Sequence, residues 1–503
     1  MSSEDSVVNI SLLVLSAIVI MIVLLLGALL IWRTPSLCAV TLGNADAKAK
    51  RIAVLAAALV SLSCMLPMGL SPLYNGEVPD HRNQYELITE AFLSGHLDFQ
   101  YDYIDPRLLE MENPYDAQAR EEQGVYAYWD HAFYDGHYYM YFGVAPVLLA
   151  FLPYRVLTGQ ALTGYHVTQL YTALHIGGLF LLLWLVGRRH FKKMPLSLYL
   201  LICSAVSYIS VWNAVATPAL YGMAIICALG LASMSLCCFA GAVWYVKSEN
   251  RAIALAALGS LLGALEFGCR PTVGLSNIVV LALLVDFIKQ RGISAKRCFK
   301  LALAALPYVL VAAGLMGYNA ARFDNPFEFG QSYQMTVTDQ SSYGNMLARF
   351  DPLAIARGLY YYLLNVNTPS ILPSLGLFVA FPLLLASFAL LAGRKTRAAV
   401  KRNGLSLLLG CVLASILVIM VFELLWAPHP TPRYRMDFAW LMGLAVFILI
   451  GSASAKDEAR FCRVAGVLCL LALAVSVVLA LYPQSGNFTE YFAADIKAML
   501  GLQ

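Results

Sequence analysis

The chain is poor in charged residues for its length. Only 13% of its 503 residues are Asp, Glu, Lys or Arg and 60% are hydrophobic, whereas soluble domains carry about 25% charged residues. The net charge of +4 excludes the strongly basic surface of nucleic-acid-binding proteins. Apolar runs of about 18 residues or more, each able to cross about 30 Å of hydrocarbon, recur along the chain. The sequence therefore predicts an all-α polytopic membrane protein.

Cysteine is missing from the one long polar segment. None of the 11 Cys falls in residues 71–141, which contain no Lys either, so no disulfide framework is expected there. No Cys or His spacing typical of a zinc site occurs, and we expect no metal ligands. The apolar run at 8–32 follows an acidic flank and precedes no small-residue cleavage site. It is therefore expected to be a retained span rather than a signal peptide.

Hydropathy and charge together predict a ladder of about 12 spans. We place them near residues 8–32, 52–70, 167–187, 195–212, 217–243, 252–268, 272–288, 301–319, 371–392, 405–425, 437–453 and 462–482. With this ladder, 23 of the 34 Lys and Arg fall in loops on one side, which the positive-inside rule assigns to the cytoplasm. Both termini are then expected on the outer side.

One shorter apolar stretch, residues 142–157, conflicts with this ladder if it crosses the membrane. Crossing would turn the basic segment 187–193 outward. The stretch is short and contains Pro146, Pro153 and Arg155, so we expect an interfacial or re-entrant helix, with a true span as the alternative.

The sequence shows no internal repeat, low-complexity tract or separate soluble domain. Residues 1–51 are expected to form an extra N-terminal transmembrane helix and a cytoplasmic linker, and residues 52–503 the main transmembrane domain. Two long extracytoplasmic segments, 71–166 and 320–370, interrupt that domain, and the first is expected to contain interfacial helices.

Two carboxylates precede a predicted helix at the start of the first long loop. Glu77 and Asp80 come before apolar positions in residues 87–92 whose spacing makes one face of a helix, and Gly95 is suited to end it. A carboxylate at the start of a helix is held in one orientation. From spacing alone, Asp80 could cap the helix by accepting backbone N–H bonds.

The later part of the same loop is rich in aromatic residues. Asp135 and Gly136 between two aromatic runs predict a tight turn, and the aromatic rings suit the headgroup belt of a membrane.

Arginines stand near the outer ends of three later spans. Arg270 follows Glu266 by one helical turn, which suits either an ion pair or the lining of a polar cavity. Arg322 and Glu328 belong to the distinctive string YNAARFDNPFEFGQSYQ, where Arg322 could hold a phosphate and Glu328 a sugar or an Arg. An ordered loop packed on the first long loop is the alternative for this string.

The short loop before the span at 437–453 carries a second pair of arginines. Arg433 and Arg435 flank Tyr434 and precede Asp437. The forked guanidinium donors of Arg suit phosphate oxygens, but snorkelling from a helix end would place Arg here as well.

These segments carry a resemblance to GT-C-fold glycosyltransferases. A span, then an acidic residue, then Tyr85 and a helix closing on Ser-Gly-His resembles the first outer loop of this superfamily, which includes protein O-mannosyltransferase and aminoarabinose-transferase relatives. The strings at 134–159 and 316–335 are similar to bacterial members, as is Arg-Tyr-x-x-Asp at 433–437. The family usually has adjacent or nearly adjacent acids with a Tyr a few residues on, whereas Glu77 and Asp80 are separated by two residues. Either acid could therefore be the base, and Asp80 is preferred because its distance from Tyr85 fits the family pattern better.

The resemblance implies a GT-C-like bundle and a membrane glycosyltransferase with its active site on the extracytoplasmic side of a bacterial plasma membrane. A monosaccharide would pass, with inversion, from a polyprenyl-phosphate donor to a glycan, lipid or protein acceptor. Asp80, Glu77 and Asp130 would be the acidic residues of catalysis. The residues expected to bind substrate are Tyr85, His81, Arg270, Arg322, Glu328, Arg433, Arg435 and Asp437. We expect no cofactor, although some members use a divalent cation; the competing class is a transporter or lipid flippase.

Overall fold

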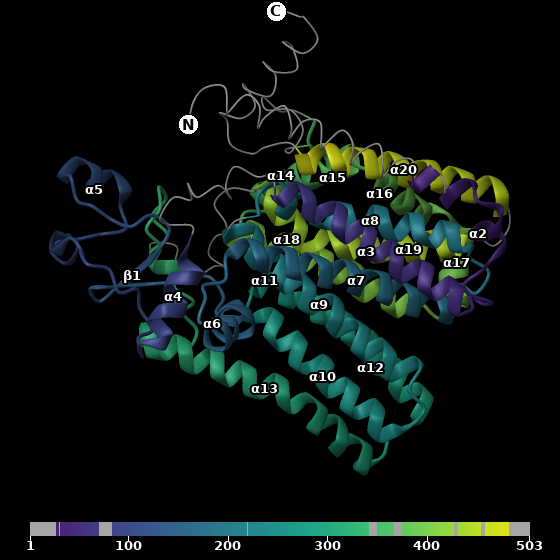
Figure 1. Ribbon diagram of the computed structural model, residues 1–503, viewed down its shortest axis with the longest axis horizontal. Helices are drawn as coiled ribbons and strands as arrows, with labels where there is room; N and C mark the ends of the chain where they lie inside the picture. The colour runs from purple at the N-terminus through teal and green to yellow at the C-terminus, as the bar shows by residue number, and fades with distance from the viewer. Residues whose placement is uncertain are drawn as a thin grey trace, which may run out of the picture.

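A computed structural model gives the fold of the protein. It describes residues 27–29, 31–69, 83–218, 220–341, 350–366, 375–426, 431–453 and 458–481. A long helical bundle carries, at one end, a smaller layer of short helices, loops and one hairpin (Figure 1). We call this layer, formed by residues 83–163 and 324–341, the polar layer.

The described residues are mostly helical. The helices are α2 (Pro35–Ala39), α3 (Ala47–Gly69), α4 (Gln84–Leu93), α5 (Ala117–Gln123), α6 (Leu152–Thr158), α7 (Gly164–His190), α8 (Leu196–Ala216), α9 (Leu220–Trp244), α10 (Glu249–Phe267), α11 (Pro271–Gly274), α12 (Ile278–Arg291), α13 (Ala295–Phe323), α14 (Pro352–Leu364), α15 (Leu377–Ala380), α16 (Pro382–Ala389), α17 (Arg394–Arg402), α18 (Ser406–Trp426), α19 (Met436–Ala453) and α20 (Glu458–Leu481). The strands are β1 (Ala132–Tyr134) and β2 (His137–Tyr139).

The predicted membrane-protein class is confirmed. Within the described ranges, 9 helical segments of 19 to 29 residues are long and apolar enough to cross a membrane, and each overlaps a span expected from the sequence. Helix α3, with 23 residues, overlaps the expected span at 52–70. Most of the expected span at 8–32 lies outside the described residues.

The expected span at 371–392 is not one helix. In its described part, α15 ends at Ala380 and α16 begins at Pro382, because proline lacks the N–H that a continuous helix needs at this point. The apolar helical stretch Pro382–Ala392 is too short to cross a bilayer on its own.

Residues 142–157 form a short helical element, as preferred from the sequence. A π-helical turn at Val147–Phe151 leads into α6 and ends at Gly159, whose φ is 72°. Val147–Thr158 is a short apolar helix. Because a dozen helical residues rise only about 18 Å, it is too short to span a membrane.

The centre of the bundle is formed by α8, α9 and α19. In the apolar stretches of α8 and α19, 100% and 94% of the residues are buried. In α13 only 6% are buried, and this helix packs mainly on α10. Small residues allow close helix contact, as where Gly178 of α7 faces Ser233 of α9. Helix α13 therefore lies at the edge of the bundle, with an apolar face directed outward (Figure 1).

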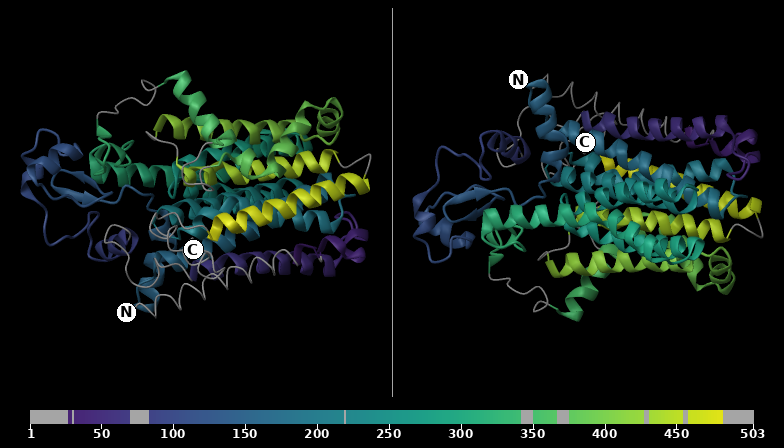
Figure 2. Two further views of the ribbon diagram at one scale, coloured as in Figure 1. Left: turned by 90° about the horizontal axis from the view of Figure 1, so that it is seen from above. Right: turned by 90° about the horizontal axis from the view of Figure 1, so that it is seen from below.

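Basic residues gather at the end of the bundle opposite the polar layer, which we call the basic end. The α7–α8, α9–α10 and α12–α13 turns and helix α17 lie there (Figure 2). Four Lys or Arg lie in or next to the α7–α8 turn and five form part of α17. The two ends of the bundle thus differ in charge in the way the topology prediction requires.

The polar layer joins segments far apart in the sequence. Strands β1 and β2 pair as a hairpin, and its turn contains Asp135 (φ 48°) and Gly136 (φ 80°), as predicted. Ala132 of β1 also bridges to Gln334, and the amide of Met335 donates to the carbonyl of His131 at 2.8 Å. The loop after α13 is therefore fixed against the first long loop.

Candidate functional site

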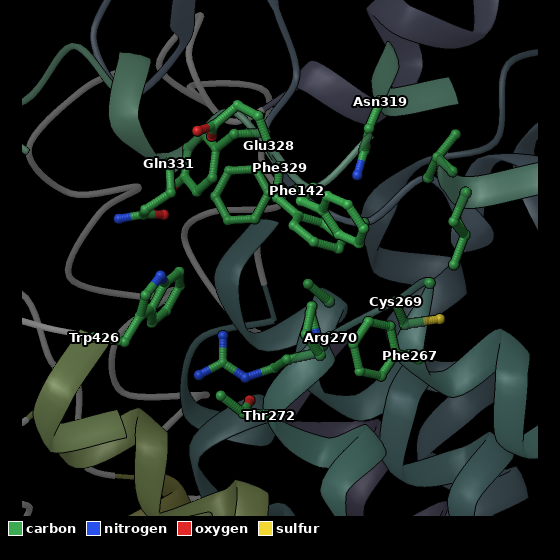
Figure 3. A pocket seen from close by; sticks show the side chains of 18 of the residues that line it. Phe142, Phe267, Cys269, Arg270, Thr272, Asn319, Glu328, Phe329, Gln331 and Trp426 are labelled. Atoms are coloured by element: carbon green, nitrogen blue, oxygen red, sulfur yellow. The ribbon is translucent and has the colours of Figure 1, made fainter. Parts of the chain in front are cut away.

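A cavity of about 410 Å³ lies where the polar layer meets the bundle. Its walls come from the loop before α6, the start of α9, the α10–α11 turn, the outer end of α13 and the loop that follows it, and the facing ends of α18 and α19. Figure 3 shows Arg270 and Thr272 on one side of this space, Glu328 and Gln331 on another, and Trp426 between them. Four of the predicted substrate-binding residues line it: Arg270, Arg322, Glu328 and Arg433.

Arg270 is neutralised by two buried carboxylates from other helices. Its Nε lies 2.5 Å from an Asp437 carboxylate oxygen, and its Nη2 lies 3.5 Å from Glu423 Oε1. Thr272 donates a hydrogen bond to Asp437, and the Arg270 guanidinium stacks on Tyr434 with 5.0 Å between its carbon and the ring centre. The ion pair with Glu266 considered from the sequence is wrong, because Glu266 accepts instead from Asn277 at 2.7 Å.

Arg322 is held without a carboxylate. Its side chain donates to the carbonyl of Met140 at 2.5 Å and to Asn319 Oδ1 at 2.8 Å, and its guanidinium carbon lies 3.8 Å from the ring centre of Tyr318. In the part of the chain that the structure describes, no Asp or Glu lies within ion-pair distance of it. Arg322 therefore brings a full positive charge to the cavity wall at 4% exposure.

Arg433 is the second arginine of this kind. Its guanidinium stacks against Tyr221 and Tyr434, with 4.4 Å and 5.2 Å from its carbon to the two ring centres. Among the described residues it too forms no ion pair. Aromatic faces hold a cation in place without cancelling its charge, so Arg433 remains available to an anion in the cavity.

Glu328 is fixed by its own loop. One carboxylate oxygen accepts the backbone amide of Gly330 at 2.7 Å, and the other accepts the hydroxyl of Ser332 at 2.9 Å. Gly330 adopts φ 89°, which glycine tolerates at no steric cost. The carboxylate thus lines the cavity in a set orientation.

Asp130 lies behind the cavity wall rather than in it. Its buried carboxylate accepts hydrogen bonds from Tyr141 at 3.0 Å, and from Tyr221 and Gln334. Both tyrosines line the cavity, whereas Asp130 does not. Burial, followed by the negative charge of Asp130, raises the pKa of Tyr141 well above its usual range, so its phenol stays protonated and donates. This geometry makes Asp130 a positioning residue.

Replacing Asp130 by asparagine should therefore destabilise the protein. The amide offers a single acceptor oxygen where three donors converge, so we expect the free energy of unfolding to fall by about 1–3 kcal/mol. Thermal unfolding in detergent measures this effect. An unfolding temperature equal to that of the wild type would contradict the positioning role.

The remaining predicted residues fall in three groups. Tyr85 lies in α4 behind the cavity wall, where its hydroxyl donates to the carbonyl of Gly143 at 3.2 Å and its ring stacks on Phe151. Arg435 is buried and donates to the carbonyls of Leu375 and Tyr361, and it does not line the cavity. Glu77, Asp80 and His81 lie outside the described residues. The N-cap position of α4 is Asn83, whose side chain makes no capping hydrogen bond, and the capping role considered for Asp80 falls outside the described residues as well.

Several cavity residues were not singled out from the sequence. Tyr141, Tyr221, Asn319 and Trp426 line the cavity, and Glu423 lies buried beneath it. Only Glu423 carried a usable signal, since a lone carboxylate in an apolar span is costly and faces a partner or cavity. No group of three or more His, Cys, Asp or Glu suited to a metal ion occurs in the described ranges, so metal independence stays a prediction.

Gly143 allows the polar layer to dock on the α10–α11 turn. A Cβ at this position would overlap the backbone carbonyl oxygens of Gly268 and Cys269, and the amide of Ala145 donates to Gly268 at 3.0 Å. We therefore expect Gly143→Ala to separate the two walls and to lower the free energy of unfolding by about 1–3 kcal/mol.

Thermal unfolding in detergent measures this effect. Gly177→Ala is the matched control, because a Cβ on this residue of α7 meets no atom within 4 Å. Equal stability of the two variants would show that the junction tolerates a side chain.

Comparison with known proteins gives matches to solved structures alone. No protein-family model matches the chain, and no curated protein sequence does. The structure is similar to the apo crystal structure of the Archaeoglobus fulgidus oligosaccharyltransferase, with 13% identity over 88% of this chain and a TM-score of 0.45. It is also similar to AglB, the archaeal oligosaccharyltransferase of the same organism, in complex with an inhibitory peptide and a dolichol-phosphate, with 13% identity over 89% of this chain and a TM-score of 0.47. The chain spans 59% of the length of each.

Proposed function

We propose that the protein is a membrane glycosyltransferase that moves a monosaccharide from a polyprenyl-phosphate donor to an acceptor hydroxyl. The observation that carries the proposal is the cavity at the membrane end of the polar layer, where Arg322 and Arg433 present positive charge without a carboxylate partner among the described residues. The forked donors of two arginines match the oxygens of a phosphate, and in a membrane protein we assign that phosphate to a lipid.

The cavity suits such a donor in shape as well as in charge. Its volume of about 410 Å³ is in the range of small-ligand sites, about 300–1,000 Å³. Phe267, Leu315 and Phe422 add apolar wall beside the arginines. The phosphate would lie against the arginines, the sugar beside Glu328 and Gln331, and the lipid chain along the apolar wall.

The reaction requires one base and one stabilised leaving group. The acceptor oxygen attacks the anomeric carbon while its proton passes to the Asp80 carboxylate. The bond between the anomeric carbon and the phosphate oxygen breaks, and its electron pair leaves with polyprenyl phosphate. Arg433 and Arg322 stabilise the negative charge that develops on that oxygen. Attack from the face opposite the leaving phosphate inverts the anomeric centre.

Arg270 and Asp437 have a supporting role in this proposal. The ion pairs with Asp437 and Glu423 fix the guanidinium under the cavity, and breaking a buried pair leaves an uncompensated charge. Arg270 thus shapes the site and adds a donor at its floor. Arg435 holds two backbone carbonyls and acts on the fold.

The test is transfer by the purified protein in nanodiscs. Labelled polyprenyl-phosphate monosaccharides are supplied with a panel of glycan, lipid and peptide acceptors, and labelled product and released polyprenyl phosphate are measured. Transfer with inversion supports the proposal. No transfer from any donor, together with substrate-driven movement of a labelled lipid or solute across liposomes that contain the protein, would identify a transporter or flippase instead.

A further inference from the structure

A second cavity, of about 550 Å³, lies at the basic end of the bundle. Three parts of the chain form it: residues 32–38, the start of α8 and the start of α20. Its lining residues are Trp32, Arg33, Cys38, Pro195, Ser197, Leu198, Cys462 and Arg463. Helix α2 lies at the end of the bundle remote from the polar layer (Figure 1), so this cavity is separate from the candidate active site.

The walls of this second cavity are tied together. The thiol of Cys38 donates to the carbonyl of Trp32 at 3.5 Å and accepts from the hydroxyl of Ser197 at 3.4 Å. Residues 40–43 pair with residues 192–196 through Leu42 N–H to Met194 O at 3.0 Å and Leu196 N–H to Val40 O at 2.8 Å. The cavity is thus built on a fixed backbone.

Trp32 packs closely against α20 at Gly466. A Cβ on Gly466 would stand 2.8 Å from the indole Nε1 of Trp32, so the ring rests on the helix where that residue has no side chain. Tryptophan prefers the headgroup level of a membrane, with its ring in apolar surroundings and its N–H near water. This preference of tryptophan, together with the basic residues of the same end, is our reason for assigning the cavity to a membrane surface.

The lining of the cavity is amphipathic. Arg33 and Arg463 contribute two cations from two different helical segments, while Trp32, Pro195 and Leu198 contribute apolar wall. Helix α17 adds Arg394, Lys395, Arg397, Lys401 and Arg402 to the charge of the same end. Basic pockets between transmembrane helices at such a surface suit the phosphate of an anionic lipid, and the apolar wall suits the glycerol and the first acyl carbons.

We infer that this cavity binds the headgroup of an anionic phospholipid. The lipid phosphate lies between Arg33 and Arg463, and the upper acyl chains pass over Trp32 and Leu198. A lipid in this place joins residues 32–38 to α8 and α20. The inference is independent of the proposed glycosyl transfer, because no residue lines both cavities.

The test measures lipid binding by native mass spectrometry on the full-length protein in detergent. Phosphatidylglycerol and phosphatidylcholine are titrated separately, and inorganic phosphate is tested as a competitor. We expect phosphatidylglycerol to bind at least tenfold more tightly than phosphatidylcholine. The double variant Arg33→Gln/Arg463→Gln should lose about 30-fold in affinity, since each Arg near an anionic headgroup contributes about fivefold. Arg33→Lys/Arg463→Lys should retain most of the preference.

Arg460→Gln is the matched control, because Arg460 is exposed on α20 three positions before Arg463 and does not line the cavity. Size-exclusion profiles and thermal unfolding of each variant without lipid establish that it is folded. Equal binding of the two lipids, unchanged binding by the double variant, or the same loss in Arg460→Gln would overturn the inference. Displacement of the lipid by millimolar phosphate would also overturn it, by identifying a small-anion site.

Discussion

Replacing Asp80 by asparagine is expected to lower the turnover number for sugar transfer by about 10²–10⁴-fold. An amide cannot take the proton of the acceptor hydroxyl, so the attacking oxygen stays a weak nucleophile. Binding of polyprenyl phosphate should change little, because the proposed phosphate contacts come from Arg322 and Arg433 on other segments. The measurement is single-turnover transfer with saturating donor, alongside the dissociation constant for polyprenyl phosphate.

Glu77→Gln provides the matched control for this prediction. Both acids precede α4, whose Tyr85 donates to the carbonyl of Gly143 at the cavity wall. We expect Glu77→Gln to retain turnover within about tenfold of wild type. The opposite pattern would move the base to Glu77, and full transfer by both variants would remove these acids from the chemistry.

The bundle could be predicted from the sequence because its signals are local. Each span is a run of apolar residues whose length matches a bilayer, and the charge of each turn is read from the same few residues. With α3 added to the nine apolar segments that can cross a membrane, ten of the expected spans appear in the described residues as helical segments. The expected span at 371–392 differs because Pro382 stops a helix that hydropathy alone would continue.

The site was only partly predictable because its contacts are long-range. Spacing suggested Glu266 as a partner for Arg270, since the two are one turn apart. The actual partner, Asp437, is 167 residues away in the sequence, and no local pattern reveals such a pair. The carboxylate of Asp130 likewise accepts a hydrogen bond from Tyr221, 91 residues away, and this contact has no local signal in the sequence.

Arg433 and Arg435 show that the contacts of neighbouring residues are also hard to predict from the sequence. The sequence has one arginine on each side of Tyr434, and nothing in it distinguishes their roles. Both lie in the 3-10 turn Pro432–Arg435. Two successive residues of such a helix rotate the side-chain direction by about 240°, so the two arginines point to different sides. Arg433 therefore faces the cavity, and Arg435 faces the carbonyls of Leu375 and Tyr361.

Because Arg433 faces the cavity, replacing it is the second change for which we expect a large effect on transfer. Arg433→Gln is expected to lower kcat/KM for transfer by about 10²–10³-fold, the cost of removing a preorganised donor to a developing negative charge. The fold should survive, because Arg433 rests on two aromatic rings and forms no ion pair within the described residues. Affinity for polyprenyl phosphate should fall as well. Arg433→Lys keeps the charge but loses the forked geometry, so an intermediate loss of about tenfold is expected.

The control for Arg433 is an arginine of the polar layer outside the cavity. Arg155 pairs with Glu90 at 2.7 Å with half of the Glu90 side chain exposed, and such exposed pairs contribute little. Arg155→Gln should therefore transfer sugar at the wild-type rate.

Arg270→Gln, in contrast, would leave Glu423 and Asp437 buried without their cation and should lower thermal stability first. If Arg433→Gln unfolds like wild type, binds polyprenyl phosphate like wild type and transfers at full rate, the cavity does not hold the donor phosphate. Loss of transfer with intact stability in Arg433→Gln, beside a stability defect in Arg270→Gln, would separate the arginine that serves the leaving group from the one that supports the site.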